Sequence, residues 1–286
     1  MSYRPYSVLM SVYGKESPQY LRESIESLLA QTVKPYEIVV VEDGFLTPEL
    51  DCVLNRFDNS YPGLFKLVSY KENRGLGFAL EQGVLSCECE FIARMDTDDV
   101  AHPRRIEKQL DAFEADPFLD MLGSQVIEFV SSPKEPVSCS DLPEEPKDIA
   151  EYSKRRNPFR HPSMMFKKSK VIEAGNYSSD FLFFEDWDLF NRMLSHGCKA
   201  RNLHEVLVAM RVSVDFFARR GGRKYLGHAY EFKKAQLRSG YFAPADFCVS
   251  FFPHAAVCMM PNSIRSFVYK RLLRKSNNDI EIKVGK

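Results

Sequence analysis

Three carboxylates lie within four residues of the chain, in the segment DTDD at residues 96–99, directly behind an apolar run at 91–93. Like charges this close repel and raise one another's pKa, unless a cation sits among them or water surrounds the loop. Carboxylate oxygens are the ligands that Mg²⁺ and Mn²⁺ prefer, and substrate phosphates commonly complete the coordination of these ions. If the segment is extended, Asp96 and Asp98 point the same way and can address one ligand together. The segment is either a divalent cation site or an ordinary solvated acidic loop or helix cap.

The residues before this segment predict a parallel α/β sheet. Residues 6–12 are an apolar run typical of a buried strand, and Ser17-Pro18 then opens a helix with Ser as N-cap and Pro at the first helical position. A second apolar run, 37–42, ends at Asp43-Gly44. Strand, helix and strand in this order indicate the start of a parallel sheet.

The same alternation continues along the chain. We expect helices at 48–59, 75–86, 103–116, 169–174 and 185–196, and strands at 65–69, 91–95 and 163–166. Gly175 and Gly197 should close the last two helices, and residues 131–147, rich in Ser, Pro and Glu, predict an exposed loop. Ligands bind at the carboxyl edge of such sheets. Asp43 and the DTDD segment should therefore converge there.

Composition fits a globular chain of 286 residues, since 44% of them are apolar. The seven cysteines show no metal-ligand or disulfide-framework spacing, which favours reduced thiols in a cytosolic protein. The N-terminus lacks the features of a signal peptide, and no stretch of about 20 apolar residues could span a bilayer. Residues 247–264 come nearest, but their prolines favour an interfacial or buried segment.

Formal charge is zero overall but is divided unevenly. Residues 219–275 carry twelve Lys and Arg against two acidic residues, a net charge of +10, so the rest of the chain is at −10. This division suggests an acidic partner for the segment, membrane lipid or nucleic acid, or only a solvated basic face.

Long ordered motifs between about residues 7 and 225 make the chain resemble the family 2 glycosyltransferases of the GT-A fold, especially bacterial enzymes that build capsule, exopolysaccharide or O-antigen. Two of the motifs are "SVLMSVYGKESPQYLRESIESLLAQTVKPYEIVVVEDG" and "NRGLGFALEQGVLSCECEFIARMDTDDVAHPRRIEKQ". Three shorter ones are "HPSMMF" at 161–166, "EDWDLFNRML" at 185–194 and "MRVSVDFFARRGG" at 210–222.

The resemblance implies an α/β fold in which a Rossmann-like, nucleotide-binding mixed sheet is flanked by helices. It implies a glycosyltransferase domain over 1–218, with a nucleotide-sugar half at 1–130 and an acceptor and catalytic half at 131–218. A basic, amphipathic and partly helical segment would follow at 219–286. Such an enzyme transfers a sugar from a UDP-sugar to an acceptor, commonly a lipid-linked saccharide at the inner face of the cytoplasmic membrane. Its partners would include this anionic membrane surface but no nucleic acid.

The resemblance also assigns residues to the donor site. Asp98 and Asp99 would bind Mn²⁺ or Mg²⁺, which neutralises charge on the departing nucleoside diphosphate. The implied nucleotide-sugar contacts are Ser11, Tyr13, Asp43, Asn73, Arg74, Asp96, Asp98, His161 and Arg211. Simpler readings stay open: strand-end packing for Ser11 and Tyr13, a turn at Asp43-Gly44, a structural His161 before proline, and an Arg211 that supports the basic face. Many relatives have Arg-Asn where this chain has Glu81-Gln82, so a basic contact is missing there or is supplied by Arg74 or Arg94.

Glu185 and Asp186 precede a helix with an apolar face, and acidic residues there can simply stabilise the helix dipole. By the resemblance they are the catalytic pair, with Asp186 as the general base that an acceptor hydroxyl needs. Attack opposite the diphosphate would invert the anomeric carbon. Two other readings compete. Residues 96–100 superficially fit the nucleophile loop of a haloacid-dehalogenase-like phosphatase, although that loop normally follows the first strand, and a non-catalytic nucleotide-sugar-binding protein would not need Asp186.

Overall fold

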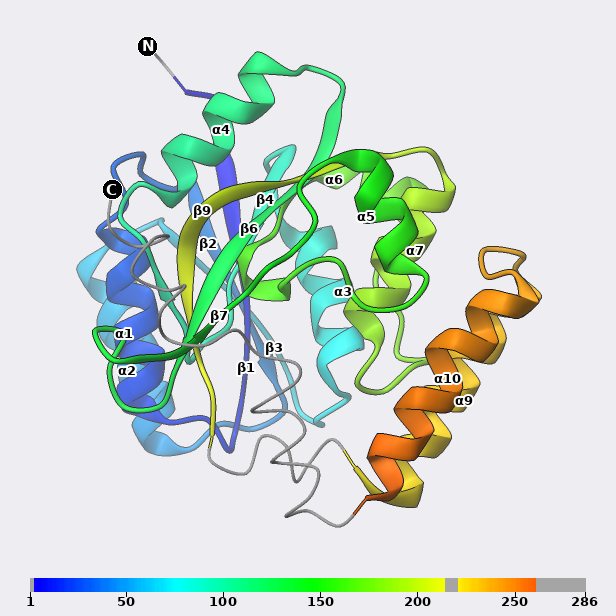
Figure 1. The fold of residues 1–286 in the computed structure, drawn as a ribbon. Helices are drawn as coiled ribbons and strands as arrows, with labels where there is room; N and C mark the ends of the chain where they lie inside the picture. The colour runs from blue at the N-terminus through cyan, green and yellow to red at the C-terminus, as the bar shows by residue number, and fades with distance from the viewer. Residues whose placement is uncertain (1–2, 214–220, 261–286) are drawn as a thin grey trace.

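The structure is a computed structural model that describes residues 3–213 and 221–260 (Figure 1). Its centre is a nine-stranded mixed sheet in the order β3-β2-β1-β4-β8-β6-β9-β5, with β7 paired to β6. The strands are β1 Tyr6–Tyr13, β2 Glu37–Asp43, β3 Phe65–Tyr70, β4 Phe91–Arg94, β5 Val100–Ala101, β6 Leu119–Phe129, β7 Pro136–Cys139, β8 Met165–Lys167 and β9 Lys199–Arg211. The helices are α1 Pro18–Leu29, α2 Pro48–Ser60, α3 Leu76–Ser86, α4 Arg105–Ala115, α5 Pro146–Ser153, α6 Lys168–Glu173, α7 Glu185–Ser195, α9 Gly222–Arg238 and α10 Pro244–Met259, with a 3₁₀ turn η1 at His161–Ser163.

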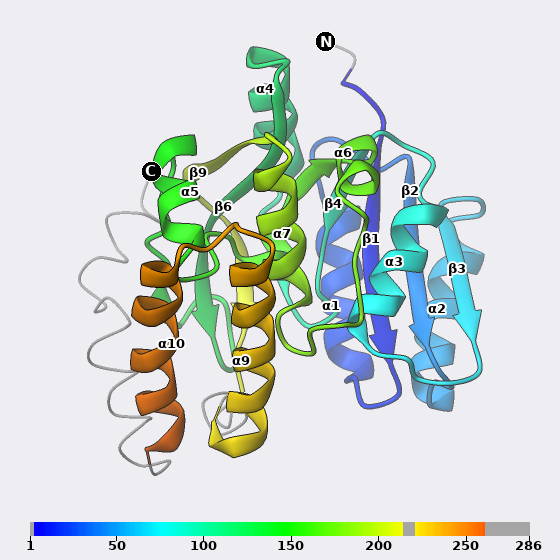
Figure 2. The ribbon, with the colours of Figure 1, turned by 90° about the vertical axis from the view of Figure 1, so that its right-hand side faces the viewer.

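The four strands β1 to β4 are parallel neighbours, which confirms the predicted parallel α/β half. β6 and β9 run parallel to each other, and β8 joins them to β4 through antiparallel pairs. The carboxyl ends of β1, β2, β4, β6 and β9 therefore share one edge of the sheet. Figure 2 shows this edge at the bottom, where the arrowheads of β1, β2 and β3 point and where α9 begins.

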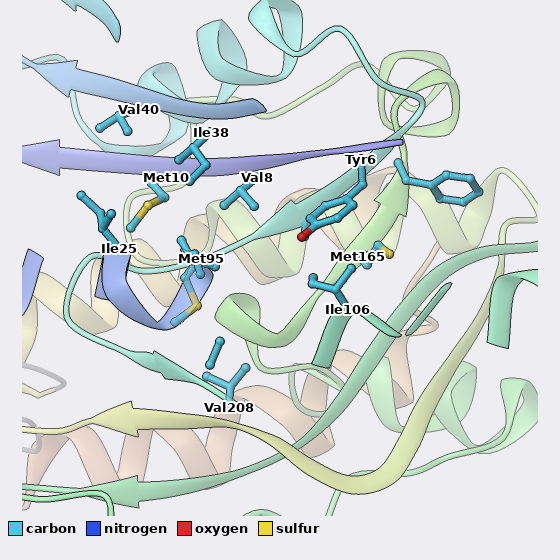
Figure 3. Close-up of a cluster of buried hydrophobic side chains, with 14 of the residues drawn as sticks. Tyr6, Val8, Met10, Ile25, Ile38, Val40, Met95, Ile106, Met165 and Val208 are labelled. Carbon is cyan, nitrogen blue, oxygen red and sulfur yellow. The ribbon is translucent and has the colours of Figure 1, made fainter. Parts of the chain in front are cut away.

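Apolar side chains form one core on each face of the sheet. Helices α1, α2 and α4 cover one face, where Ile25 and Ile106 pack on β1 residues such as Val8 and Met10 (Figure 3). Helices α3, α6 and α7 cover the other face, where Leu80 and Phe190 belong to the second core. Burial of both faces explains why the strands read as continuous apolar runs rather than as alternating patterns.

Two long strands, β6 and β9, were not predicted. β6 is buried along its whole length although it contains Asp120, Ser124, Gln125 and Glu128. These polar groups have partners: Gln125 binds the loop at Ser140 and Leu142, and Asp120 pairs with Lys167. The exposed loop expected at 131–147 was partly wrong, because β7 within it pairs with β6, and α5 begins at Pro146.

The C-terminal part of the described chain is a helical hairpin, α9 and α10, which lies beside α7 (Figures 1 and 2). Phe184 and Trp187 of the α7 region share a third apolar core with Tyr225, Phe232 and Phe242. α9 thus packs directly on the α7 region.

Candidate active site

Asp43 ends β2 at the carboxyl edge and organises the loop that begins α3. Its Oδ1 accepts hydrogen bonds from the Tyr70 hydroxyl at 2.9 Å and the Arg74 amide at 2.7 Å, and its Oδ2 accepts one from the Gly75 amide at 3.0 Å. The Asn73 side chain donates to the Asp43 carbonyl at 3.1 Å. The carboxylate is buried, so the structure gives Asp43 a structural task in addition to the predicted nucleotide contact.

This loop passes very close to the end of β2. Gly44 has a φ of 83°, and a Cβ at this position would lie 2.6 Å from the Asn73 backbone nitrogen. Glycine is therefore required by both conformation and space. The Arg74 guanidinium leaves the loop and lies 3.4 Å from the centre of the Phe78 ring, on the surface where a nucleotide could reach it.

Ser11 and Tyr13 lie at the carboxyl end of β1, at the same edge of the sheet, and Tyr13 pairs in register with Asp43. The Tyr13 side chain is 42% exposed, whereas Ser11 is half-buried. An exposed ring beside the Asp43 loop offers a flat apolar face of the kind on which a nucleobase can stack.

The DTDD segment lies between β4 and β5 and forms a turn at residues 97–98, so the expected extended conformation was wrong. α1 and the preceding loop hold the turn. The Ser24 hydroxyl donates to the Asp96 carbonyl at 2.8 Å, and the Thr97 hydroxyl donates to Glu16 at 2.9 Å. The turn brings Asp96 and Asp98 close enough for their charges to interact.

The three carboxylates of the segment have different surroundings. Asp96 forms an ion pair with the buried Arg94, at 2.5 Å. Asp99 is 2% exposed and accepts the Arg211 amide at 2.6 Å. Burial raises the pKa of Asp98 to about 7, with further contributions from Asp96 and Glu16, whose charges have the same sign.

Arg211 locks this turn to the rest of the edge. Its Nε donates to the Asp98 carbonyl at 3.0 Å, and its Nη2 pairs with Glu23 of α1 at 2.6 Å. The guanidinium also lies over the Tyr20 ring, 3.8 Å from its centre. These contacts explain why Arg211 stands at the end of β9 without any need for a diphosphate.

Few of the described side chains at this edge are available to bind the predicted cation. No group of three His, Cys, Asp or Glu side chains converges to hold a metal within residues 3–213 and 221–260. An ion with one or two protein carboxylates and substrate phosphates does not need such a cage. Asp98 fits this arrangement, since a cation beside it would offset the neighbouring negative charges that raise its pKa.

A buried His–Tyr pair lies between the acidic turn and α7. His161 Nε2 and the Tyr177 hydroxyl are 2.8 Å apart, and burial, together with the charge of Arg94, holds the pKa of His161 well below its usual range. The pKa of Tyr177 is raised chiefly by burial, and it also responds to the charges of Arg94, Asp186 and Asp96. Tyr177 thus lies within electrostatic reach of both acidic groups, and His161 is a neutral supporting residue.

Glu185 and Asp186 occupy the first turn of α7, as predicted. Asp186 Oδ2 accepts a hydrogen bond from the Asn157 side chain at 2.8 Å, and its Oδ1 accepts one from the Trp187 amide at 2.7 Å. Asp186 is half-buried, whereas Glu185 is buried. Burial, with some help from Asp186, raises the pKa of Glu185 to about 7, although the nearby backbone amides of Glu185 and Phe183 act in the opposite direction. The two neighbouring carboxylates therefore differ: Asp186 is partly accessible, whereas Glu185 is enclosed.

Glu185→Gln is expected to make the protein relatively more stable as pH rises. The Glu185 pKa lies above its ordinary value of 4.5, so the folded state binds more protons than the unfolded state between pH 4.5 and about 7. Stability is lost as pH increases through this window. The variant's unfolding free energy relative to wild type should increase by up to about 3 kcal/mol between pH 4.5 and 8. Urea unfolding at both pH values, with the exposed Glu26→Gln as control, measures it; a pH-independent difference would contradict the assignment.

Several residues at this edge were not identified from the sequence. Tyr70 and Gly75 complete the Asp43 clamp, and Glu16 holds the acidic turn. Asn157 donates to Asp186, whose charge reaches Tyr177. Each acts across a long sequence separation, so no local spacing in one sequence could have identified it. "NPFRHP" places Asn157 just ahead of a quoted motif, which is the nearest signal available.

Known proteins share this architecture. The fold is that of GT-A glycosyltransferases: the structure matches a mannosyltransferase of Pyrobaculum calidifontis, solved in complex with GDP-Man and Mn²⁺, with a TM-score of 0.64 and 18% identity over 92% of this chain and 72% of that one. It also matches residues 1–349 of Staphylococcus aureus TarS with a TM-score of 0.62 and 16% identity, over 98% of this chain and 83% of that one.

Sequence relatives cover nearly the whole chain. An Escherichia coli UDP-Gal:alpha-D-GlcNAc-diphosphoundecaprenol beta-1,3-galactosyltransferase is 34% identical over 94% of this chain and 97% of its own length. The amylovoran biosynthesis glycosyltransferase AmsE of Erwinia amylovora is 36% identical over 93% of this chain and 98% of its own. The sequence profile of glycosyl transferase family 2 matches residues 7–173. The chain therefore belongs to glycosyl transferase family 2.

Proposed function

We propose that the protein is an inverting, metal-dependent hexosyltransferase that moves a sugar from a UDP-sugar to a lipid-linked saccharide in surface polysaccharide synthesis. The observation that carries this proposal is that Tyr177 lies within electrostatic reach of both acidic groups, Asp96 in the DTDD turn and Asp186 in α7. Asp98 lies beside Asp96 among like charges, and Asn157 holds Asp186. The galactosyltransferase relative, whose name specifies a UDP-sugar and a diphosphoundecaprenol-linked acceptor, supports this substrate class.

The residues divide the reaction between them. Asp98 would hold Mn²⁺ or Mg²⁺, with Asp99 fixing the turn through the Arg211 amide. The cation would neutralise charge on the diphosphate as the sugar–oxygen bond breaks. Tyr13 and the Asp43 loop would receive the nucleotide. Asp186, oriented by Asn157, would take the proton of the acceptor hydroxyl as its oxygen attacks the anomeric carbon from the opposite side.

A panel of UDP-sugars tests this proposal. UDP release is measured in Mn²⁺ with and without a synthetic GlcNAc-α-diphosphate that carries a long alkyl chain. Acceptor-dependent UDP release from at least one donor, with a lengthened product by mass spectrometry, supports transfer. Release of inorganic phosphate alone would return the phosphatase reading, and UDP binding without turnover with any donor would indicate a non-catalytic binding protein.

We propose further that the enzyme works at the inner face of the cytoplasmic membrane, with α10 as the contact. The phenylalanines of this helix differ in their surroundings: Phe247 and Phe251 pack with Tyr230 of α9, whereas Phe252 is 60% exposed. The exposed residues of α10 recur at helical spacing and are mainly apolar: Pro244, Ala245, Cys248, Val249, Phe252, Pro253, Ala256 and Met259. Of the three phenylalanines at 247, 251 and 252, only Phe252 is therefore exposed. The basic residues that follow, Arg265, Lys270 and Arg271, lie outside the described residues.

None of the helices described is long and apolar enough to cross a bilayer. A helix lying in the interface would instead combine this apolar face with attraction of the basic segment to anionic lipid. The proposal follows from the apolar outward face of α10 and from the lipid-linked acceptor in the relative's name.

Val249→Ser combined with Phe252→Ser is expected to weaken binding to anionic vesicles at least tenfold, since two inserted apolar side chains are lost. Wild type should float with vesicles that contain phosphatidylglycerol and dissociate at high salt. Phe118→Ser, which changes a 79% exposed ring on the turn before β6, serves as the matched control. Equal flotation of wild type and the double variant would rule out α10 as the contact.

A further inference from the structure

Phe183 combines three unusual properties directly beside the catalytic pair. Its φ is 73°, in the left-handed region where a bulky side chain is an outlier. Its ring is 51% exposed. It lies three residues before Asp186, on the loop that leads into α7. Strained residues of this kind cluster at binding and catalytic sites, because surrounding structure must hold them there.

The surrounding structure does hold this conformation. The Phe184 amide donates to the Phe181 carbonyl at 2.8 Å, which closes the turn, and the Phe183 amide lies close to the Glu185 carboxylate. Phe184 itself is buried and stacks on Phe232 of α9, with ring centres 5.0 Å apart. The two adjacent rings therefore separate, one anchored in the third core and the other presented at the surface.

The presented ring packs against two aromatic side chains of α9, both of which carry polar atoms. It contacts the Tyr225 ring at 5.4 Å and meets the His228 ring nearly edge-on at 5.7 Å, both distances between ring centres. Asp180 on the same loop is exposed. An exposed aromatic face with hydrogen-bonding groups around it suits a ligand that has one apolar face and a polar rim.

A pyranose ring is such a ligand, since its C–H groups form an apolar face and its hydroxyls lie around the edge. We propose that Phe183 is the stacking platform for the acceptor sugar, and that Glu185 is a positioning residue that holds the platform rather than a second base. This inference rests on the proposed function and names the acceptor subsite of the same active site. The stacked sugar would lie beside Asp186, where its hydroxyl needs a base.

Phe183→Gly separates this role from a structural one. Glycine adopts a φ of 73° without strain, so the melting temperature should not fall, whereas the acceptor KM should rise about tenfold or more with kcat largely retained. Phe183→Tyr and Phe183→Trp should restore the acceptor KM. UDP binding in Mn²⁺ and acceptor-independent UDP release should not change, and Phe118→Ala, at the opposite edge of the sheet, should match wild type in every assay.

A readout that does not need turnover uses Trp187, the one tryptophan of the chain, which packs with Phe184. Its fluorescence is titrated with GlcNAc-α-diphosphate on a short alkyl chain. The titration midpoint should shift to higher concentration in Phe183→Gly. An unchanged midpoint and acceptor KM in this variant, with UDP binding intact, would overturn the platform. Failure of wild type to bind UDP would instead overturn the proposed function, and the platform with it.

Discussion

Asp186→Asn is expected to lower kcat for sugar transfer by at least ~10²-fold, the usual scale for loss of a general base. An amide cannot take the proton of the attacking hydroxyl, yet it has the same shape and can keep a hydrogen bond to Asn157. The donor Kd should stay nearly unchanged, because Asp186 acts on the acceptor side. Single-turnover transfer and calorimetric UDP binding, measured on the same preparation, test both statements.

Glu185→Gln is the matched comparison, since it alters the neighbouring carboxylate by the same single atom. If Glu185 only holds the Phe183 amide, its loss should act mainly on the acceptor KM. A large fall in kcat for Glu185→Gln, with near-normal kcat for Asp186→Asn, would exchange the two roles. Loss of donor binding in Asp186→Asn would move that residue to the nucleotide site.

Asp98→Asn is expected to reduce metal-dependent transfer by at least ~10²-fold, the cost of removing one electrostatic contact to a developing charge. Without metal, the variant should melt at a higher temperature than wild type, because a desolvated carboxylate among Asp96 and Glu16 is replaced by a neutral group. Activity thus falls while stability increases, a combination that general damage to the fold does not produce.

Asp99→Asn provides a contrast, because Asp99 is buried and accepts the Arg211 amide. It should weaken UDP-sugar binding and also lower the melting temperature, by loosening the turn. Differential scanning fluorimetry with and without Mn²⁺ and UDP, alongside initial rates, distinguishes the two aspartates. Full transfer activity in excess chelator would exclude a metal requirement altogether.

The sequence predicted the first half of the fold well, because each of its elements has a local signature. β1, β2 and β4 are apolar runs buried on both faces, and α2 begins at Thr47-Pro48, where the Thr47 hydroxyl accepts the Leu50 amide. One detail of this half was not predicted correctly. Ser17 occupies the N-cap of α1, but its side chain makes no capping hydrogen bond.

The second half was harder to predict because long-range pairs define it. β6 interrupts its apolar residues with Gln125 and Glu128, whose polar groups are satisfied by partners 10 to 17 residues away. β9 carries charged residues at both ends and in the middle, and its C-terminal part pairs with both β6 and β5. Period and composition in a single sequence do not report such pairings.

The candidate site shows the same division. Motif types and their position predicted where Asp43 and Asp98 lie, at strand ends, and where Asp186 lies, at the start of a helix. They could not show that Asp43 binds the α3 loop or that Arg211 is already paired with Glu23, since both are properties of residues brought together by folding. The sequence therefore identified the edge of the sheet that holds the site, whereas the contacts of each side chain there became visible only in the folded structure.

α7 belongs to two apolar cores at once: Leu189 and Phe190 pack toward the sheet, and Trp187 packs toward Phe232 of α9. A polar bridge reinforces the second contact, since Gln236 of α9 donates to Asp188 and accepts from Asn191. The helix that begins with Glu185 and Asp186 is consequently held on two sides, by the sheet and by α9. Loss of the hairpin would uncover the back of this helix, so the hairpin, α7 and the sheet are joined in one cooperative melting unit.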